Sequence, residues 1–377
     1  MKAFNVCVIG GGIAGLSLAA RLARHGSVVV LEAESAPGYH ASGRSVAFAH
    51  FGLGERVVRT LTALSLPELA AEPTDGRARA SVVHPALHIA SKDTLDGLDA
   101  LEEVHLSFGC DVARLSGEEA RALVPALKVG PEHCHAALID HGALKLDADA
   151  MLQGHVRDLR AHGGELVCGA QVTAIARKGA DWVIETAGEC YCAPLVVNAA
   201  GAWVDEIAAL AGLTPIGIEP RRRTVISFAA PAGTDVRHWP FTKTVGAGFY
   251  MLPEGSGQLL ASPMDEGESA PCDAAPEEID IATIAYRIEE ANDLTVGRIT
   301  HSWAGLRSFA PDELPVVGHA AGAPGFVWYA GLGGYGFQTS PALSRIGEAI
   351  ALGQAWPRDL LAEGLAPELF APARFGA

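Results

Sequence analysis

The first thirty residues alternate between short apolar runs and a helical pattern. Phe4 to Ile9 is a largely β-branched run that stops at a glycine cluster, as a buried parallel strand does. From Ile13 to His25 apolar residues recur at helical spacing, and Gly26 stands where a C-cap is expected. Val28 to Leu31 is a second buried run. The pattern predicts a strand, a helix and a strand within about 30 residues, which is one βαβ unit.

Beyond this unit the period of the pattern changes several times. Helical patterns are predicted over residues 55–70, 117–124, 147–162, 281–292 and 340–352. Strand patterns are predicted over residues 81–90, 166–167, 171–177, 182–185, 190–191, 195–198, 224–228, 249–252 and 326–330. The strands between 166 and 191 are separated by glycine turns, which is typical of an antiparallel meander.

The first turn of the βαβ unit has the sequence Gly10-x-Gly12-x-x-Gly15. The three glycines allow a tight turn, a close approach of the backbone to a pyrophosphate, and packing of the helix on the strand. Glu32 ends the second strand, where its carboxylate can accept both ribose hydroxyls of an adenosine. The unit predicts a bound dinucleotide, and by itself leaves NAD and FAD open.

We therefore expect a mixed α/β chain (α+β, two domains), with a Rossmann-like nucleotide domain and a substrate domain on an antiparallel sheet. Both domains are assembled from non-adjacent segments. The predicted nucleotide domain comprises residues 1–80, 142–212 and 301–377, and the substrate domain comprises 81–141 and 213–300.

Composition narrows the classes of protein. Of 377 residues, 49% are hydrophobic and 19% are charged, which indicates a globular chain. The net charge of −16 disfavours nucleic acid as a partner. Seven cysteines without a CxxC pair predict neither disulfides nor a metal site, and they favour a reducing, cytoplasmic location, with a peripheral position at the inner membrane as the alternative. We expect no transmembrane segment.

A second glycine turn, Gly331 to Gly336, lies between a predicted strand and a predicted helix. Its backbone amides could approach a flavin ring and stabilise negative charge on the reduced form.

Motifs in the same order along the chain resemble the D-amino-acid oxidase family of FAD enzymes: Gly10 to Gly15 with Glu32, Pro37 to Ser45, Val197 to Trp203, Trp303 to Arg307, Pro315 to Gly318 and Gly331 to Gly336. Within it, the chain is similar to bacterial D-amino-acid dehydrogenases, D-arginine dehydrogenase in particular.

The resemblance implies FAD bound without a covalent bond, and oxidation of the Cα–N bond of an amino acid. The residues expected to contact the cofactor are Gly10, Gly12, Ile13, Ala14, Gly15, Glu32, Ala33, Ser42, Gly43, Arg44, Ser45, Val172, Ala200, Gly201, Trp203, Gly333, Gly334, Tyr335, Gly336 and Phe337.

Such a reaction requires a clamp on the substrate carboxylate, and a guanidinium offers bidentate geometry. The resemblance places Arg222 and Arg307 there, and Tyr250 could add its hydroxyl. Strand alternation is expected to turn Arg221 and Arg223 to the other face. A surface ion pair remains the alternative for Arg222, and a core position the alternative for Tyr250. No side-chain base is evident, so alignment and loss of the amine proton would drive hydride transfer.

The expected substrate pocket consists of Phe48, His50, Leu53, Leu87, His88 and Gly334. Leu87 stands where D-arginine dehydrogenase has the acid that pairs with its cationic substrate. Phe48, Phe51 and Leu53 also replace polar pocket residues of that relative. We therefore predict D-amino acids with neutral or apolar side chains, rather than D-arginine, as substrates, giving an imino acid that hydrolyses to a 2-oxo acid and ammonia.

Three alternatives stay open. The same clamp and flavin would serve an N-alkylated or cyclic amino acid, or a 2-hydroxy acid. The chain could also be the flavin subunit of a larger electron-transfer dehydrogenase. The electron acceptor is expected to be a quinone, an electron carrier or oxygen.

Overall fold

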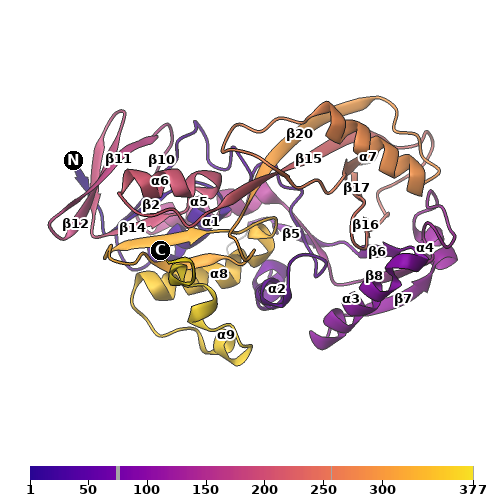
Figure 1. Ribbon diagram of the computed structural model, residues 1–377, viewed down its shortest axis with the longest axis horizontal. Helices are drawn as coiled ribbons and strands as arrows, with labels where there is room; N and C mark the ends of the chain where they lie inside the picture. The colour runs from indigo at the N-terminus through magenta and orange to yellow at the C-terminus, as the bar shows by residue number, and fades with distance from the viewer. Residues whose placement is uncertain (74–76, 256, 377) are drawn as a thin grey trace.

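The computed structural model describes residues 1–73, 77–255 and 257–376. Within them, a six-stranded sheet forms the centre of the half of the molecule that holds both termini (Figure 1). Its order is β10 (Glu165–Val167), β3 (Val28–Leu31), β2 (Val6–Ile9), β14 (Leu195–Asn198), β22 (Phe326–Ala330) and β21 (Val316–His319). The first five strands are parallel, and β21 is antiparallel to β22. The apolar runs predicted as strands are almost completely buried here.

Both faces of this sheet are covered. Four helices share a core on one face: α1 (Ile13–Leu22), α2 (Arg56–Ala70), α5 (Ala148–Ala161) and α8 (Gly336–Ala351). The other face carries α6 (Val204–Leu210) and the meander β1 (Lys2–Ala3), β13 (Cys190–Ala193), β12 (Asp181–Thr186) and β11 (Val172–Lys178). Short α9 (Arg358–Ala362) follows α8. The predicted dinucleotide-type domain is present.

The other half is built on a nine-stranded sheet within the described residues. Its order is β19 (Gly267–Glu268), β15 (Glu219–Ala229), β18 (Gln258–Ser262), β17 (Tyr250–Glu254), β16 (Phe241–Thr244), β6 (Ala86–Ala90), β8 (Ala136–Asp140) and β7 (Val112–Ser116), with β20 (Ile299–Phe309) paired to β15. Its pairs are antiparallel except β16 with β6. Helices α3 (Leu95–Ser107), α4 (Gly117–Leu123) and α7 (Glu278–Ala291) flank it. A small sheet of β4 (Phe48–Ala49), β9 (Leu144–Leu146) and β5 (Ser81–Val83) lies apart from it.

Most predicted elements are confirmed within a few residues, and the differences have local causes. The strand predicted over 81–90 is divided into β5 and β6 near Pro85, which lacks a backbone N–H for a ladder bond. Helix α8 begins at Gly336, before the predicted 340, and tolerates Pro341 near its start. The elements that were not predicted include helices α3, α6 and α9 and strands β7, β8, β9, β16, β18, β20 and β21. The proposed domain boundary at residue 300 falls inside β20, so the boundaries themselves stay predictions.

None of the helices in the described residues is long and apolar enough to cross a membrane. In the same residues, no group of three or more His, Cys, Asp or Glu side chains is arranged to hold a metal ion.

Candidate active site

An elongated cavity of about 1630 Å³ is lined by residues of both large sheets. One end lies against the first turn of α1 and the end of β3, and the other lies beneath β15, β17 and β20. Its volume exceeds the several hundred Å³ that is common for a single small ligand. The cavity therefore has room for a dinucleotide together with a substrate.

The first glycine turn brings β2, β14 and α1 close together. Gly10 has a φ of +111°, and a Cβ atom there would lie 2.4 Å from the carbonyl oxygen of Ala199. A Cβ on Gly15 would lie 2.0 Å from the carbonyl oxygen of Gly10. A side chain at either position would force the turn apart, so the motif is required for packing as well as for any ligand.

Two polar side chains hold this turn in place. The Ser42 hydroxyl accepts a hydrogen bond from the backbone N–H of Ile13, at 2.9 Å, at the start of α1. The carboxylate of Glu32 accepts hydrogen bonds from the N–H groups of Gly11, at 2.7 Å, and Glu34, at 2.9 Å. Glu32 is thereby fixed in the cavity wall at the end of β3, where the sequence predicts ribose binding.

The second glycine turn joins the two ends of the cavity. Gly331 and Gly333 have φ values of +70° and +48°, which favour glycine. A Cβ on Gly336 would lie 3.3 Å from the side chain of Ile13 in α1, and one on Gly334 would lie 3.1 Å from the Arg307 side chain. The turn is therefore packed between the first glycine turn and an arginine of β20.

Most residues predicted to bind the cofactor line this cavity: Gly10, Gly12, Ile13, Ala14, Glu32, Ala33, Ser42, Arg44, Ser45, Val172, Ala200, Gly201, Trp203, Gly333, Gly334, Tyr335, Gly336 and Phe337. Gly15 and Gly43 do not; a Cβ on Gly15 would lie 2.0 Å from the carbonyl oxygen of Gly10, and one on Gly43 would lie 2.5 Å from that of Gly38. The small residues, the fixed acid and the long cavity fit a dinucleotide cofactor.

The pairing of β15 with β20 decides which arginines reach the cavity. Arg221 stands directly opposite Arg307, so Arg221, Arg223 and Arg307 share one face of the sheet. Arg223 and Arg307 line the cavity. Arg222 is on the opposite face, where its Nε lies 3.1 Å from Asp280 and its Nη1 also pairs with Glu277. The prediction that Arg222 faces the site is therefore wrong. The next residue, Arg223, faces the cavity instead, because side chains alternate between the two faces of a strand.

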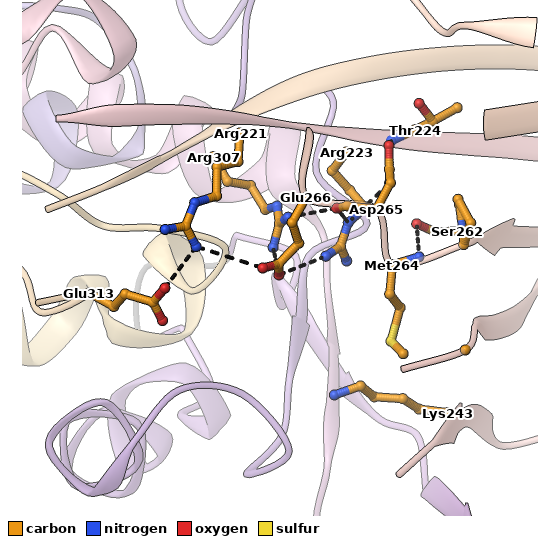
Figure 2. A network of polar contacts seen from close by, with 12 residues as sticks. Arg221, Arg223, Thr224, Lys243, Ser262, Met264, Asp265, Glu266, Arg307 and Glu313 are labelled. Atoms are coloured by element: carbon orange, nitrogen blue, oxygen red, sulfur yellow. Dashed lines mark hydrogen bonds and ion pairs between the residues drawn. The ribbon is translucent and has the colours of Figure 1, made fainter. Parts of the chain in front are cut away.

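The carboxylate of Glu266 lies among the three guanidinium groups of the cavity face (Figure 2). It is 3.1 Å from Arg307, 3.5 Å from Arg223 and 3.7 Å from Arg221. The carbonyl oxygen of Asp265 also accepts hydrogen bonds from Arg223 and Arg307. Burial, followed by the charge of Arg223, lowers the pKa of Arg307 to about 10, while Glu266 opposes that shift. Three guanidinium groups thus surround one carboxylate, that of Glu266.

An aromatic wall continues from these arginines. The Phe48 and Phe241 rings are stacked with centroids 4.5 Å apart, and those of Phe241 and Tyr250 are 5.5 Å apart. All three rings line the cavity, as does His50. Burial raises the pKa of Tyr250 and lowers that of His50 well below its usual range, so both side chains are neutral near pH 7.

The other predicted pocket residues divide into two groups. Leu53 and Gly334 line the cavity. Leu87 does not, because it is fully buried in the core of the nine-stranded sheet. His88 lies behind His50, with ring centroids 5.5 Å apart, and also stays outside the cavity lining. The residue that would decide side-chain specificity is therefore not at position 87.

Sequence reasoning missed Lys243, which lines the cavity on β16. Its Nζ donates a hydrogen bond to the carbonyl oxygen of Gly52, at 2.6 Å. Burial lowers the pKa of this lysine to about 8, with further lowering from Arg223 and Arg59. The alternation of Phe241 and Lys243 with polar threonines was the available signal, but the strand is short and was not predicted.

Comparisons with known proteins agree with this picture. The DAO family model, described as FAD dependent oxidoreductase, matches residues 5–349. The hydrogen cyanide synthase subunit HcnC of Pseudomonas aeruginosa is 25% identical over an alignment of 379 positions, gaps included, that covers 86% of this chain and 87% of that protein. The L-alpha-glycerophosphate oxidase of Mycoplasma pneumoniae has a TM-score of 0.84 at 18% identity, covering 95% and 96% of the two chains. The glycine oxidase of Geobacillus kaustophilus has a TM-score of 0.80 at 20% identity, covering 97% and 99%.

Proposed function

Because the chain belongs to the DAO family of FAD-dependent oxidoreductases, we propose that it oxidises the Cα–N bond of an amino acid. FAD, when bound, supplies the acceptor for the hydride that leaves Cα. Glu32, Ser42 and the two glycine turns would hold the cofactor without a covalent bond. The name of glycine oxidase, a similar protein, is consistent with oxidation of an amino acid.

The observation that carries the proposal is the pair of cavity arginines beside the second glycine turn. Arg307 contacts Gly334 and lies on the same sheet face as Arg223. Two guanidinium groups at one end of a dinucleotide cavity can fix a substrate carboxylate by bidentate hydrogen bonds. The Tyr250 hydroxyl, kept neutral by burial, can donate a further hydrogen bond. A carboxylate held there orients Cα toward the ring that the second turn supports.

The amine has to be neutral before a hydride can leave Cα. His50 is neutral and lines the cavity, and we propose it as a polar contact for the substrate rather than as its main base. Alignment by the arginines would do most of the work.

For the side chain, we propose a group without positive charge, in the D configuration. Phe48 and Phe241 offer an apolar wall, whereas Lys243, Arg223 and Arg307 repel a cationic group. D-Arginine and D-lysine are therefore expected to be poor substrates. The product would be an imino acid, which hydrolyses to a 2-oxo acid and ammonia.

A second candidate is a flavin subunit that needs a partner for activity. The name of HcnC, a subunit of hydrogen cyanide synthase, favours it. Full activity of the chain purified alone, with an artificial electron acceptor, would contradict this alternative.

The test is anaerobic mixing of the purified FAD-containing protein with single D- and L-amino acids, with N-methyl and cyclic amino acids and with 2-hydroxy acids, followed at the flavin absorbance. We expect bleaching by D-amino acids and little by D-arginine. The proposed reaction is wrong if 2-hydroxy acids alone bleach the flavin or if no amino acid does. Faster reduction by D-arginine than by D-leucine, D-methionine or D-phenylalanine would contradict the side-chain preference.

A further inference from the structure

Lys243 lies in the middle of the substrate end of the cavity. Its strand, β16, pairs with β17 and β6, and Lys243 stands directly opposite Tyr250 on one side and His88 on the other. Phe241, two residues before it, is on the same face of the strand and also lines the cavity. The lysine is therefore next to the proposed carboxylate clamp and the aromatic wall.

The partners of Lys243 differ from those of Arg44, Arg223 and Arg307, although the cavity cation Arg287 also donates to carbonyl oxygens, those of Gly248 and Pro263. Arg223 and Arg307 face the carboxylate of Glu266, and Arg44 pairs with Asp273. Lys243 donates to one carbonyl oxygen, that of Gly52, and in residues 1–73, 77–255 and 257–376 it forms no ion pair. In Figure 2 it lies apart from the arginine and Glu266 network and makes no polar contact with the other residues drawn.

An ammonium group withdrawn from water without a counter-ion is unfavourable, and an anion that enters the cavity relieves that cost. The neighbouring charges strengthen the attraction. Arg223, Arg59 and Arg307 act on Lys243 as like charges, and Glu266 is the acid that acts on it. His50 and His88 are held neutral by burial. The cavity next to Lys243 therefore attracts negative charge.

The pairing of β16 with β17 places Lys243 beside Tyr250. Side chains directly opposite one another on paired strands have Cβ atoms about 5 Å apart, so Lys243 is a neighbour of Tyr250. A carboxylate bound by Arg307 and Tyr250 leaves room for a short chain to reach the ammonium group.

Building on the function proposed above, we propose that the substrate is an amino acid with two carboxylates. Arg307 and Arg223 bind the first carboxylate, and Lys243 binds the second. The second carboxylate can belong to the side chain, as in D-aspartate and D-glutamate, or to a substituent on the nitrogen, as in iminodiacetate. Phe241 contacts the methylene groups between the two. This replaces the neutral or apolar side chain that the sequence predicts with an acidic group, because Lys243 lines the cavity.

The experiment compares each acid with its neutral counterpart in the FAD-containing protein. kcat/KM is measured for D-aspartate against D-asparagine, D-glutamate against D-glutamine, and iminodiacetate against glycine. We expect at least one acid to be favoured by about tenfold or more, as a charge-assisted contact provides. In the variant Lys243→Met that preference is lost, so the ratio of kcat/KM for each acid to that of its neutral counterpart falls toward one. Lys243→Arg retains part of the preference.

Lys145→Met is the matched control, because Lys145 pairs with Glu254 outside the cavity. It should leave the preference unchanged. Binding gives a readout without turnover: succinate should bind the wild type at least about tenfold more tightly than butyrate, and Lys243→Met should remove the difference.

The outcomes separate the two proposals. If neutral amino acids reduce the flavin and no acid is favoured in wild type, the two-carboxylate inference is overturned and amino-acid oxidation stands. If no amino acid reduces the flavin, the proposed function itself fails. Preference for iminodiacetate alone assigns the second carboxylate to the nitrogen substituent, and preference for D-aspartate or D-glutamate assigns it to the side chain. Should Lys243→Met fail to fold, the wild-type ratios and Lys243→Arg decide.

Discussion

The two ends of the cavity are lined by different kinds of residue. Around α1 the wall is backbone and small side chains, held by close contacts such as that between Gly15 and the carbonyl oxygen of Gly10. Beneath β15 and β20 the wall is long charged side chains, whose partners are Glu266, Asp265 and the carbonyl oxygen of Gly52. At the first end a substitution acts through shape, and at the second it acts through charge.

This difference predicts what each end can tolerate. A glycine turn that fits a dinucleotide tolerates almost no substitution, because a Cβ added to one of its tightly packed glycines collides with backbone atoms. A set of charges can be changed one at a time, so the substrate end can alter its ligand while the cofactor end is preserved. The following experiments test that division.

The largest effect is expected for Gly15→Val. The new side chain would displace the first glycine turn, so the protein should lose at least about tenfold in FAD affinity and about 1–3 kcal/mol in its free energy of unfolding. The ratio of flavin to protein absorbance and urea unfolding measure the two changes. Gly188→Ala is the control, because a Cβ at Gly188 meets no atom within 4 Å. Normal flavin content in Gly15→Val would refute the packing role of the turn.

The next largest effect distinguishes Arg307 from Arg222, which lie on paired strands but face opposite sides of the sheet. Arg307→Gln should lower kcat/KM about 100-fold or more, since a charged hydrogen-bond donor to the substrate carboxylate is lost. Arg222→Gln should change kcat/KM less than about threefold but destabilise the fold by about 3 kcal/mol, because the largely buried Asp280 loses its partner. Steady-state kinetics and urea unfolding of both variants provide the measurement. The reverse assignment of effects would restore Arg222 to the site.

The pH dependence of the acid preference should follow the ionisation of Lys243. Its pKa is lowered from 10.5 to about 8, chiefly by burial, so the ammonium form is present below pH 8 and is lost above it. The groups that face it are Arg223, Arg59, Arg307 and Glu266, together with neutral Tyr250 and His88 on the paired strands.

The ratio of kcat/KM for a two-carboxylate substrate to that of its amide should therefore fall about tenfold between pH 7 and pH 9.5. The amines of an acid and of its amide differ in pKa, so the same ratio measured in Lys243→Met is the reference that corrects for their titration. The fall is expected in the wild-type ratio divided by this reference. A fall of the same size in the variant would assign the ionisation to another group.

The smallest effect is expected for Glu266→Gln. The side chain of Glu266 is 52% exposed, so its contacts with Arg223 and Arg307 are weak. Removing its charge should lower KM by about two- to fivefold, because the substrate carboxylate no longer competes with it, and should leave kcat almost unchanged. Glu254→Gln, outside the cavity, serves as the comparison. A raised KM would mean that Glu266 helps to bind the substrate.

The cofactor end could be predicted almost completely from the sequence, since local spacing defines it. Gly10, Gly12 and Gly15 follow a recognisable strand, and Glu32 ends the next one, so each position is fixed by its own neighbours in the chain. The second turn before α8 is defined in the same local way, although the helix begins earlier than predicted.

The substrate end depends on contacts between distant segments, and there the prediction failed in part. Three consecutive arginines offer no local signal for which one faces inward; the pairing of Arg221 with Arg307, 86 positions away, decides it. Lys243 was missed because β16 is four residues long and pairs with segments on both sides. Leu87 lies on a strand, as predicted, but its side chain is buried in the core and not in the predicted substrate pocket.

The contact of Gly336 with Ile13 also bears on the order in which the protein can assemble. The cofactor site needs residues near both ends of the chain, and the parallel pairing of β14 with β22 joins residue 197 to residue 327. Such long-range pairing forms slowly, and a growing polypeptide lacks the partner strands until almost all of it has been synthesised. Flavin capture is thus expected to be a late, post-synthetic event, and a chain truncated before residue 326 should be unable to retain the yellow cofactor.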